Sequence, residues 1–119
     1  MEFQKLVQIA IENGGMSYNP ATDELNPSTG YMVSLDGYEV KSSELTDELL
    51  KKYYLGKMLL AYANLPEGSE IYLGLWKDDQ WYFDVSVKIN DFEEATRLAK
   101  LFNQKAFFSN ATKESIFVA

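Results

Sequence analysis

The sequence predicts a single α+β domain in which a mainly antiparallel sheet is packed by three helices. Its length of 119 residues is typical of one domain and is long enough to bury a core. Segments with the 3.6-residue apolar spacing of helices alternate with pairs of short apolar segments that are bounded by turn residues. No internal repeat or linker interrupts the pattern. We therefore expect one domain over residues 1–119 with the element order αββαββαββ.

The first helix is expected over residues 2–13, where apolar side chains recur at helical spacing. Gly14-Gly15 follows it as a stop, because glycine adopts the left-handed conformation that is common just beyond a helix end. Residues 14–30 are predicted to form a long loop, since they contain two Asn-Pro dipeptides, which favour turns. A loop of this length in a small domain is usually functional or disordered.

Two strands are expected next, over residues 31–35 and 38–42. Asp36-Gly37 lies between them and is a favoured two-residue hairpin turn, so the two strands are predicted to pair with each other. A second helix follows, capped by Thr46 and ending near Asn64. Residues 53–63 of this helix carry a single charge, which is compatible either with a central core helix or with a face for a partner or a second copy.

Residues 70–89 are predicted to form a β-hairpin. A three-residue loop over residues 77–79 places Leu75 opposite Trp81 and Leu73 opposite Phe83, which gathers the apolar side chains on one face, and burial of that face selects the register. The other face then carries Tyr72, Gly74, Trp76, Tyr82, Asp84 and Ser86. The third helix is expected over residues 90–104, and two closing strands over residues 105–109 and 114–119.

The composition excludes several classes of function. The chain contains neither His nor Cys, which removes the commonest general base, the commonest metal ligands, thiol chemistry and disulfides. We therefore expect no enzyme activity, no metal and no cofactor. The net charge is −7 and arises entirely within residues 1–50, so a nucleic-acid surface is not expected. No segment has the length of a membrane span and no signal peptide is evident, which predicts a cytoplasmic protein without membrane contact.

One group of side chains has the chemistry of a site. In the predicted register Tyr72 lies opposite Asp84, with Tyr82 and Ser86 on the same face, and a carboxylate beside hydroxyl groups can serve acid–base chemistry if its pKa is shifted. The simpler interpretation is that Asp84 accepts hydrogen bonds from the 14–30 loop or from Tyr72 and holds the loop on the sheet. Under that interpretation Asp84→Ala is expected to lower stability by about 1–3 kcal/mol.

Five fragments follow one another in a characteristic order, and they are NGGMSYNP, NPSTGYMVSLDG, YLGLW, WYFDVS and NQKAFF. Together they resemble a family of small uncharacterised proteins and domains encoded by phages, prophages and conjugative elements. The resemblance covers most of the chain and implies a genomic context but no mechanism. Its motif positions are Gly14, Gly15, Asn19, Pro20, Gly30, Tyr31, Met32, Val33, Ser34, Trp76, Asp84, Ser86, Asn103 and Gln104.

These observations favour a protein-binding accessory factor of a phage or mobile element, such as an inhibitor of a host CRISPR nuclease or restriction enzyme. Its acidic surface would meet a basic partner, and self-association through helix 53–63 or a sheet edge is also open. The expected partner-binding residues are Tyr18, Asp23, Glu24, Tyr31, Asp36, Tyr38 and Glu39. The alternative is a small-molecule or nucleotide module on the sheet face beneath the 14–30 loop. The residues expected to anchor that loop or to face a ligand are Tyr72, Trp76, Tyr82, Asp84, Ser86, Asn103 and Gln104.

Overall fold

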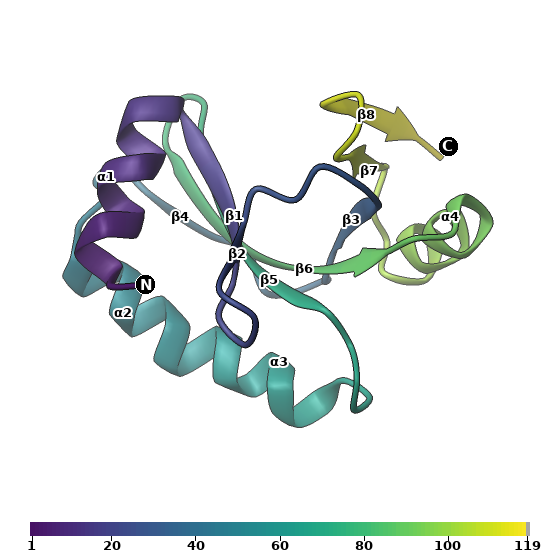
Figure 1. Cartoon of the computed structure of the whole chain (residues 1–119), viewed down its shortest axis with the longest axis horizontal. Helices are drawn as coiled ribbons and strands as arrows, with labels where there is room; N and C mark the ends of the chain where they lie inside the picture. The colour runs from purple at the N-terminus through teal and green to yellow at the C-terminus, as the bar shows by residue number, and fades with distance from the viewer. Residues whose placement is uncertain (119) are drawn as a thin grey trace.

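The computed structural model describes residues 1–118 and confirms the α+β class. Its three helices are α1 (Phe3–Asn13), the continuous helix formed by α2 (Asp47–Tyr53), η1 (Tyr54–Met58) and α3 (Leu59–Asn64), and α4 (Phe92–Leu101). The strands are β1 (Gly15–Asn19), β2 (Glu24–Leu25), β3 (Tyr31–Ser34), β4 (Val40–Ser42), β5 (Ile71–Lys77), β6 (Trp81–Ile89), β7 (Ala106–Ser109) and β8 (Glu114–Phe117). They form one antiparallel sheet of order β2-β1-β5-β6-β3-β7-β8, with β4 pairing to β6 (Figure 1).

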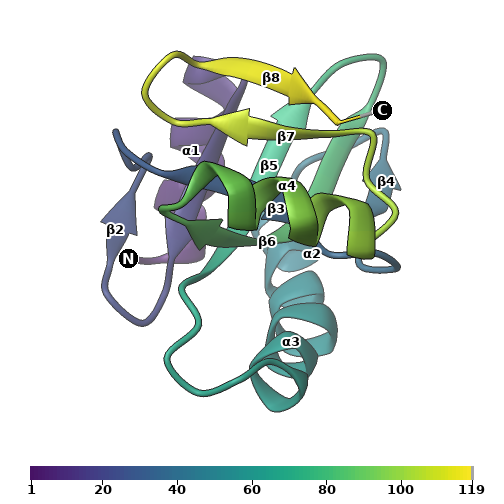
Figure 2. The same cartoon turned by 90° about the vertical axis from the view of Figure 1, so that its right-hand side faces the viewer.

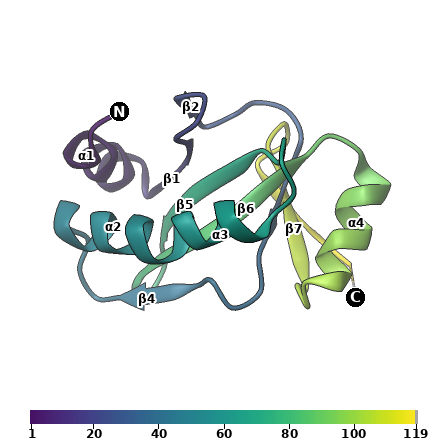
Figure 3. The ribbon, with the colours of Figure 1, turned by 90° about the horizontal axis from the view of Figure 1, so that it is seen from below.

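All three helices pack against one face of this sheet. Figure 3, seen from below, shows α2 and α3 running in front of β5 and β6, with α1 at one end and α4 at the other. Leu73, Leu75, Phe83 and Val85 point to this face and are almost completely buried in the main core. At the far end α4 lies across β3 and β6 (Figure 2), and Tyr31 packs edge-on against aromatic rings of α4 and β7. Among the described residues, no helix lies on the opposite face of the central strands.

The predicted hairpin over residues 31–42 is wrong, because β3 and β4 do not pair with each other. Both strands pair with the same edge of β6, which is long enough to accept them one after the other. Leu35 still pairs with Val85, and Val40 then pairs with Phe83. Residues 36–39 therefore bulge out opposite the single residue Asp84. The Asp-Gly sequence forms the turn of this bulge and not the end of a hairpin.

The register of the β5–β6 hairpin also differs from the prediction. Leu75 lies opposite Phe83 and Gly74 opposite Asp84, so the loop comprises residues 78–80 and Tyr72 faces Ser86 instead of Asp84. A shift of the partner by two residues leaves every side chain on its predicted face, because the side-chain period of a strand is two. The observed register places a glycine opposite Asp84, and a Cβ at position 74 would collide with the carboxylate of Asp84.

Part of the predicted loop over residues 14–30 forms strands of the sheet. Residues 15–19 form β1, which pairs with β5, and β2 folds back onto β1 as the sheet edge. Gly15 is required there, since a Cβ would lie 2.6 Å from the carbonyl oxygen of Leu75. Met16 and Tyr18 are buried on the helix face, so the strand has the expected alternation, but it is too short to stand out among Gly and Asn-Pro turn signals.

The second helix agrees with the prediction, and part of its surface is apolar. Tyr53, Met58 and Ala61 are buried against the sheet. Leu55, Leu59 and Leu60 remain 43–54% exposed on the outer side. Within residues 1–118 no helix combines the length and the apolar character that crossing a bilayer requires.

Candidate binding groove

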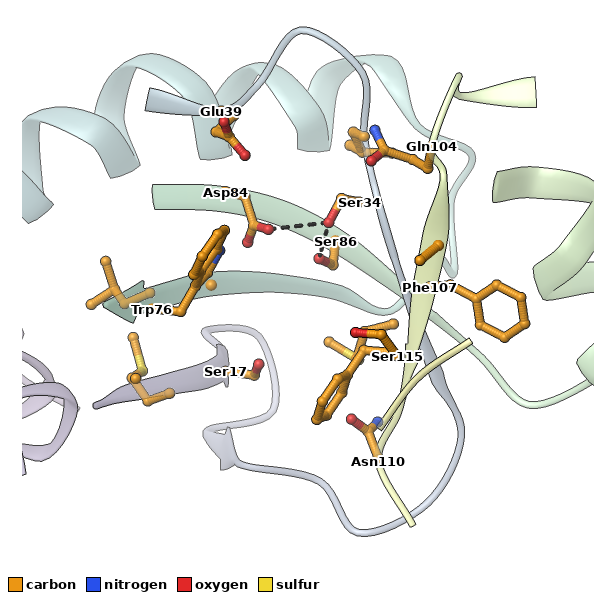
Figure 4. Close-up of a pocket in the computed structure, with 18 of the residues that line it drawn as sticks. Ser17, Ser34, Glu39, Trp76, Asp84, Ser86, Gln104, Phe107, Asn110 and Ser115 are labelled. Atoms are coloured by element: carbon orange, nitrogen blue, oxygen red, sulfur yellow. Dashed lines mark hydrogen bonds between the residues drawn. The ribbon is translucent and has the colours of Figure 1, made fainter. Parts of the chain in front are cut away.

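A groove of about 920 Å³ lies on the sheet face that the helices leave uncovered (Figure 4). Small residues occupy neighbouring positions on adjacent strands of this face, so the surface is hollow there. The large rings of Trp76 and Phe108 form its borders. Its size is within the range of pockets that bind small molecules or single side chains of a partner. The small strand residues that line it are Gly15, Ser17, Ser34, Gly74, Ser86, Ala106 and Ser115.

Asp84 lies on the floor of the groove. The Ser34 hydroxyl donates a hydrogen bond of 3.1 Å to its Oδ2, and Ser34 Oγ lies 3.4 Å from Ser86 Oγ (Figure 4). Its Oδ1 lies against the backbone of Gly74, which has no side chain to occupy that space. Among residues 1–118 no other side chain donates to this carboxylate, and the ion pairs found there do not include it.

The pKa of Asp84 is raised to about 6, from an ordinary value of 3.8. Burial is the largest cause, because a carboxylate loses favourable hydration when protein surrounds it. The hydrogen bond from Ser34 acts in the opposite direction, and the negative charge of Glu39 adds a small further rise. The fold thus keeps an acid where no cation of its own compensates the charge.

Trp76 forms one wall of the groove, beside Asp84 (Figure 4). Trp76 is 40% exposed, and its indole stacks on Tyr82 with a centroid distance of 4.1 Å and an interplanar angle of 8°. Tyr82 is itself held by a 2.6 Å hydrogen bond from its hydroxyl to Asp79 and by Lys41, whose Nζ lies 5.4 Å from the ring centroid. The indole therefore occupies a defined position although it is exposed.

The charged residues that line the groove are mostly acidic. Asp36 and Glu39 come from the bulge between β3 and β4, and with Asp84 they give three carboxylates. Lys113, in the turn between β7 and β8, is the one cationic side chain among the lining residues within 1–118. The groove therefore favours a cationic ligand over an anionic one.

The structure separates the predicted partner-binding residues. Asp36 and Glu39 lie at the groove, whereas Asp23 and Glu24 lie at the β1–β2 turn on the sheet edge. The Asp23 carboxylate accepts hydrogen bonds from the hydroxyl of Tyr18 and from the N-terminal ammonium group. The remaining predicted side chains are structural to a large extent: Tyr18 is buried, and Tyr31 and Tyr38 are half-buried.

The predicted anchoring of residues 14–30 by Asp84, Ser86 and Gln104 is wrong. Asp84 and Ser86 contact Ser34, and the Gln104 amide donates to the carbonyl of Phe102. All three of the predicted anchors line the groove. The pairing of β1 with β5 takes the place of anchoring by these three residues, because the backbone groups of β1 bond within the sheet.

Two other predicted anchors are placed away from the groove. Tyr72 is fully buried and does not line the groove, and its hydroxyl donates to the carboxylate of Glu24, which belongs to the 14–30 segment. Asn103 is exposed just beyond α4 with a positive φ of 61°, a conformation that asparagine tolerates better than most residues.

Asn110 is a lining residue that the sequence did not predict. Its buried side chain donates a 2.9 Å hydrogen bond to the carbonyl of Thr29, and its backbone N–H donates to the carbonyl of Gly30 at 3.0 Å. These bonds tie the segment before β3 to the β7–β8 turn and close one end of the groove. An asparagine in a turn carries no signal of so distant a partner.

The arrangement is suited to binding. It offers a carboxylate acceptor, hydroxyl groups and an aromatic wall, and no group of three metal-binding side chains occurs among residues 1–118. No protein-family model, no curated protein and no solved structure matches this chain. The function must therefore be inferred from the groove itself.

Proposed function

We propose that this chain is a non-enzymatic binding factor that docks a basic segment of a protein partner in the groove. The observation that carries this proposal is the combination of an open groove of about 920 Å³ with the carboxylates Asp36, Glu39 and Asp84 among its lining residues. Complementary charge steers a basic partner toward such a surface and orients it there. The acidic excess of residues 1–50 acts in the same direction.

The resemblance to phage and mobile-element proteins supplies the biological context of the proposal. A small acidic factor of this kind would act in the host cytoplasm, where CRISPR nucleases and restriction enzymes expose basic channels for nucleic acid. The role proposed is inhibition of such a defence protein by occupation of part of a basic surface. A net charge of −7 is modest, so the contact would be local and centred on the groove.

A second candidate is a small-molecule module that uses the same groove, and the volume of the groove supports it. A nucleotide is the less favourable ligand, because its phosphates would meet Asp36, Glu39 and Asp84 with Lys113 as the opposing cation. A small cationic or neutral polar ligand fits the same chemistry as a basic side chain.

The test is affinity purification of the tagged chain from host cells that carry defence systems, together with a plaque assay for phage protection. The matched variants are Ser115→Trp, which fills the groove from exposed strand β8, and Glu114→Trp, which places the same ring on the other face of that strand. We expect a basic partner to be recovered by the wild type and by Glu114→Trp and to be lost with Ser115→Trp. Recovery of no partner by the wild type, with no protection of phage, would refute the protein-binding role.

A further inference from the structure

We propose that Asp84, Trp76 and the small residues between them form a subsite for a single arginine side chain of the partner. This inference rests on the proposed function and specifies the chemical group that the groove recognises. It follows from the strand register, the contacts of Asp84 and the position of the indole.

The first argument is the incomplete bonding of the Asp84 carboxylate. Oδ2 accepts one hydrogen bond, from Ser34, and Oδ1 lies against the Cα of Gly74, which provides no N–H or O–H donor. A carboxylate has room for about four hydrogen bonds, so most of its accepting capacity is directed to the groove. A planar guanidinium supplies paired N–H donors and the positive charge that this site lacks.

The second argument is the shape of the floor. Across the sheet, Ser17 on β1 lies beside Gly74 on β5, which lies beside Asp84 on β6. One row further along, Gly15 lies beside Trp76. Gly15 and Gly74 have no side chain, and Ser17 has only a hydroxymethyl group. A long ligand side chain can therefore lie above them and reach Asp84 end-on.

The third argument is the open side of Trp76. Tyr82 covers one face of the indole, whereas the strand neighbour on the opposite side is Gly15, which has no side chain to cover it. A ligand stem that passes above Gly15 packs against the indole, and arginine stacks well on tryptophan. An arginine that packs its methylene groups there brings its guanidinium over Gly74, next to Asp84.

The experiment uses N-acetyl-arginine methylamide as the probe and the citrulline analogue as its uncharged, nearly isosteric control. Binding is followed by NMR, through the backbone amides and the indole N–H of Trp76. We expect a dissociation constant on the order of millimolar for the arginine probe, as is usual for one side chain, and no comparable binding of citrulline.

Two charge-neutralising variants isolate the role of Asp84. Asp84→Asn is expected to weaken the arginine probe by roughly tenfold or more, because a charge-assisted pair is lost. Asp78→Asn removes the same charge at the exposed hairpin tip and should bind like the wild type. Trp76→Leu, at an exposed position, should also weaken binding while leaving the fold intact.

Proton competition gives an independent readout. The pKa of Asp84 is raised to about 6, so most Asp84 carboxyl groups are protonated at pH 5 and ionised at pH 8. Arginine should therefore bind roughly tenfold less tightly at pH 5 than at pH 8. The other charged groups at the groove are Asp36, Glu39 and Lys113. The same pH series with Asp84→Asn measures the pH dependence that these groups cause, and subtracting it leaves the part due to Asp84.

Several results would overturn the subsite. These are equal affinity of the arginine and citrulline probes, unchanged binding by Asp84→Asn, or no spectral shift at any soluble probe concentration. Partner capture is scored separately. If Asp84→Asn captures the partner as the wild type does, the proposed function stands and the subsite is refuted. If the wild type binds the arginine probe but recovers no partner, the subsite stands and the proposed function fails.

Discussion

Neutralising Asp84 should stabilise this protein. The carboxylate is desolvated on the floor of the groove, and within residues 1–118 it receives one hydrogen bond, from Ser34, and takes part in no ion pair. Asp84→Asn keeps the shape and a side-chain oxygen that can accept from Ser34, but it removes the charge of this half-buried group. This expectation reverses the one drawn from the sequence, in which Asp84 held a loop and its loss was destabilising.

The magnitude follows from the pKa. A difference of one pKa unit corresponds to about 1.4 kcal/mol, so a rise from 3.8 to about 6 corresponds to about 3 kcal/mol of lost stability at neutral pH. The groove is open to water, which screens part of this cost. We therefore expect Asp84→Asn to raise the free energy of unfolding by about 1–3 kcal/mol at pH 7.

The pH dependence has a defined sign. Because the pKa of Asp84 is higher in the folded protein than in the unfolded chain, folding favours the protonated acid. The contribution of Asp84 to the free energy of unfolding of the wild type is therefore greatest below about pH 4. It falls as the pH rises through about 6 and is constant at higher pH. The advantage of Asp84→Asn should be largest at pH 7–8 and should vanish near pH 4.

The assay is urea unfolding of the wild type, Asp84→Asn and the control Asp78→Asn at several pH values between 4 and 8. Asp78 is exposed, so its neutralisation should change stability by no more than about 0.5 kcal/mol. Asp23, Asp79 and Glu94 have lowered pKa values, but they are common to all three proteins and cancel in the differences. A loss of stability in Asp84→Asn at pH 7, or a gain that does not vary with pH, would refute the reasoning.

Three further predictions concern the frame of the groove and the outer helix surface. Asn110→Ala should lower the free energy of unfolding by about 1–3 kcal/mol, because the carbonyl of Thr29 loses its buried donor; equal urea midpoints for variant and wild type would contradict this. Gly74→Ala should be strongly destabilising because its Cβ meets the Asp84 carboxylate, and the cost should fall in an Asp84→Ala background; additive costs in this double-mutant cycle would show that the contact is not the cause. Any self-association through the exposed apolar strip of the second helix should be lost in Leu59→Glu, and identical gel-filtration profiles at every concentration would reject the strip as an interface.

Asp84 could be singled out from the sequence, but its contacts could not be predicted. A mid-strand aspartate is unusual enough in sequence to be singled out. Its partner could not be predicted, because Ser34 reaches it only through the pairing of β3 with β6. The sheet face that carries Asp84 was predicted as the alternative ligand face, but the extent of the groove was not predicted, since it results from small residues that neighbouring strands bring together from across the chain.

Local signals in the sequence determined the positions of the helices and the two faces of the β5–β6 hairpin. The composition by itself excluded chemistry that depends on His or Cys. Helix caps and side-chain periodicity act within a few residues, so they can be recognised without knowledge of the fold. The tertiary structure alone decided that residues 15–19 form a strand, that β3 and β4 share one edge of β6, and that Gly74 faces Asp84. These outcomes depend on which distant backbone edges remain available for hydrogen bonding and on which side chains collide once the strands are adjacent, and neither is encoded by any one segment.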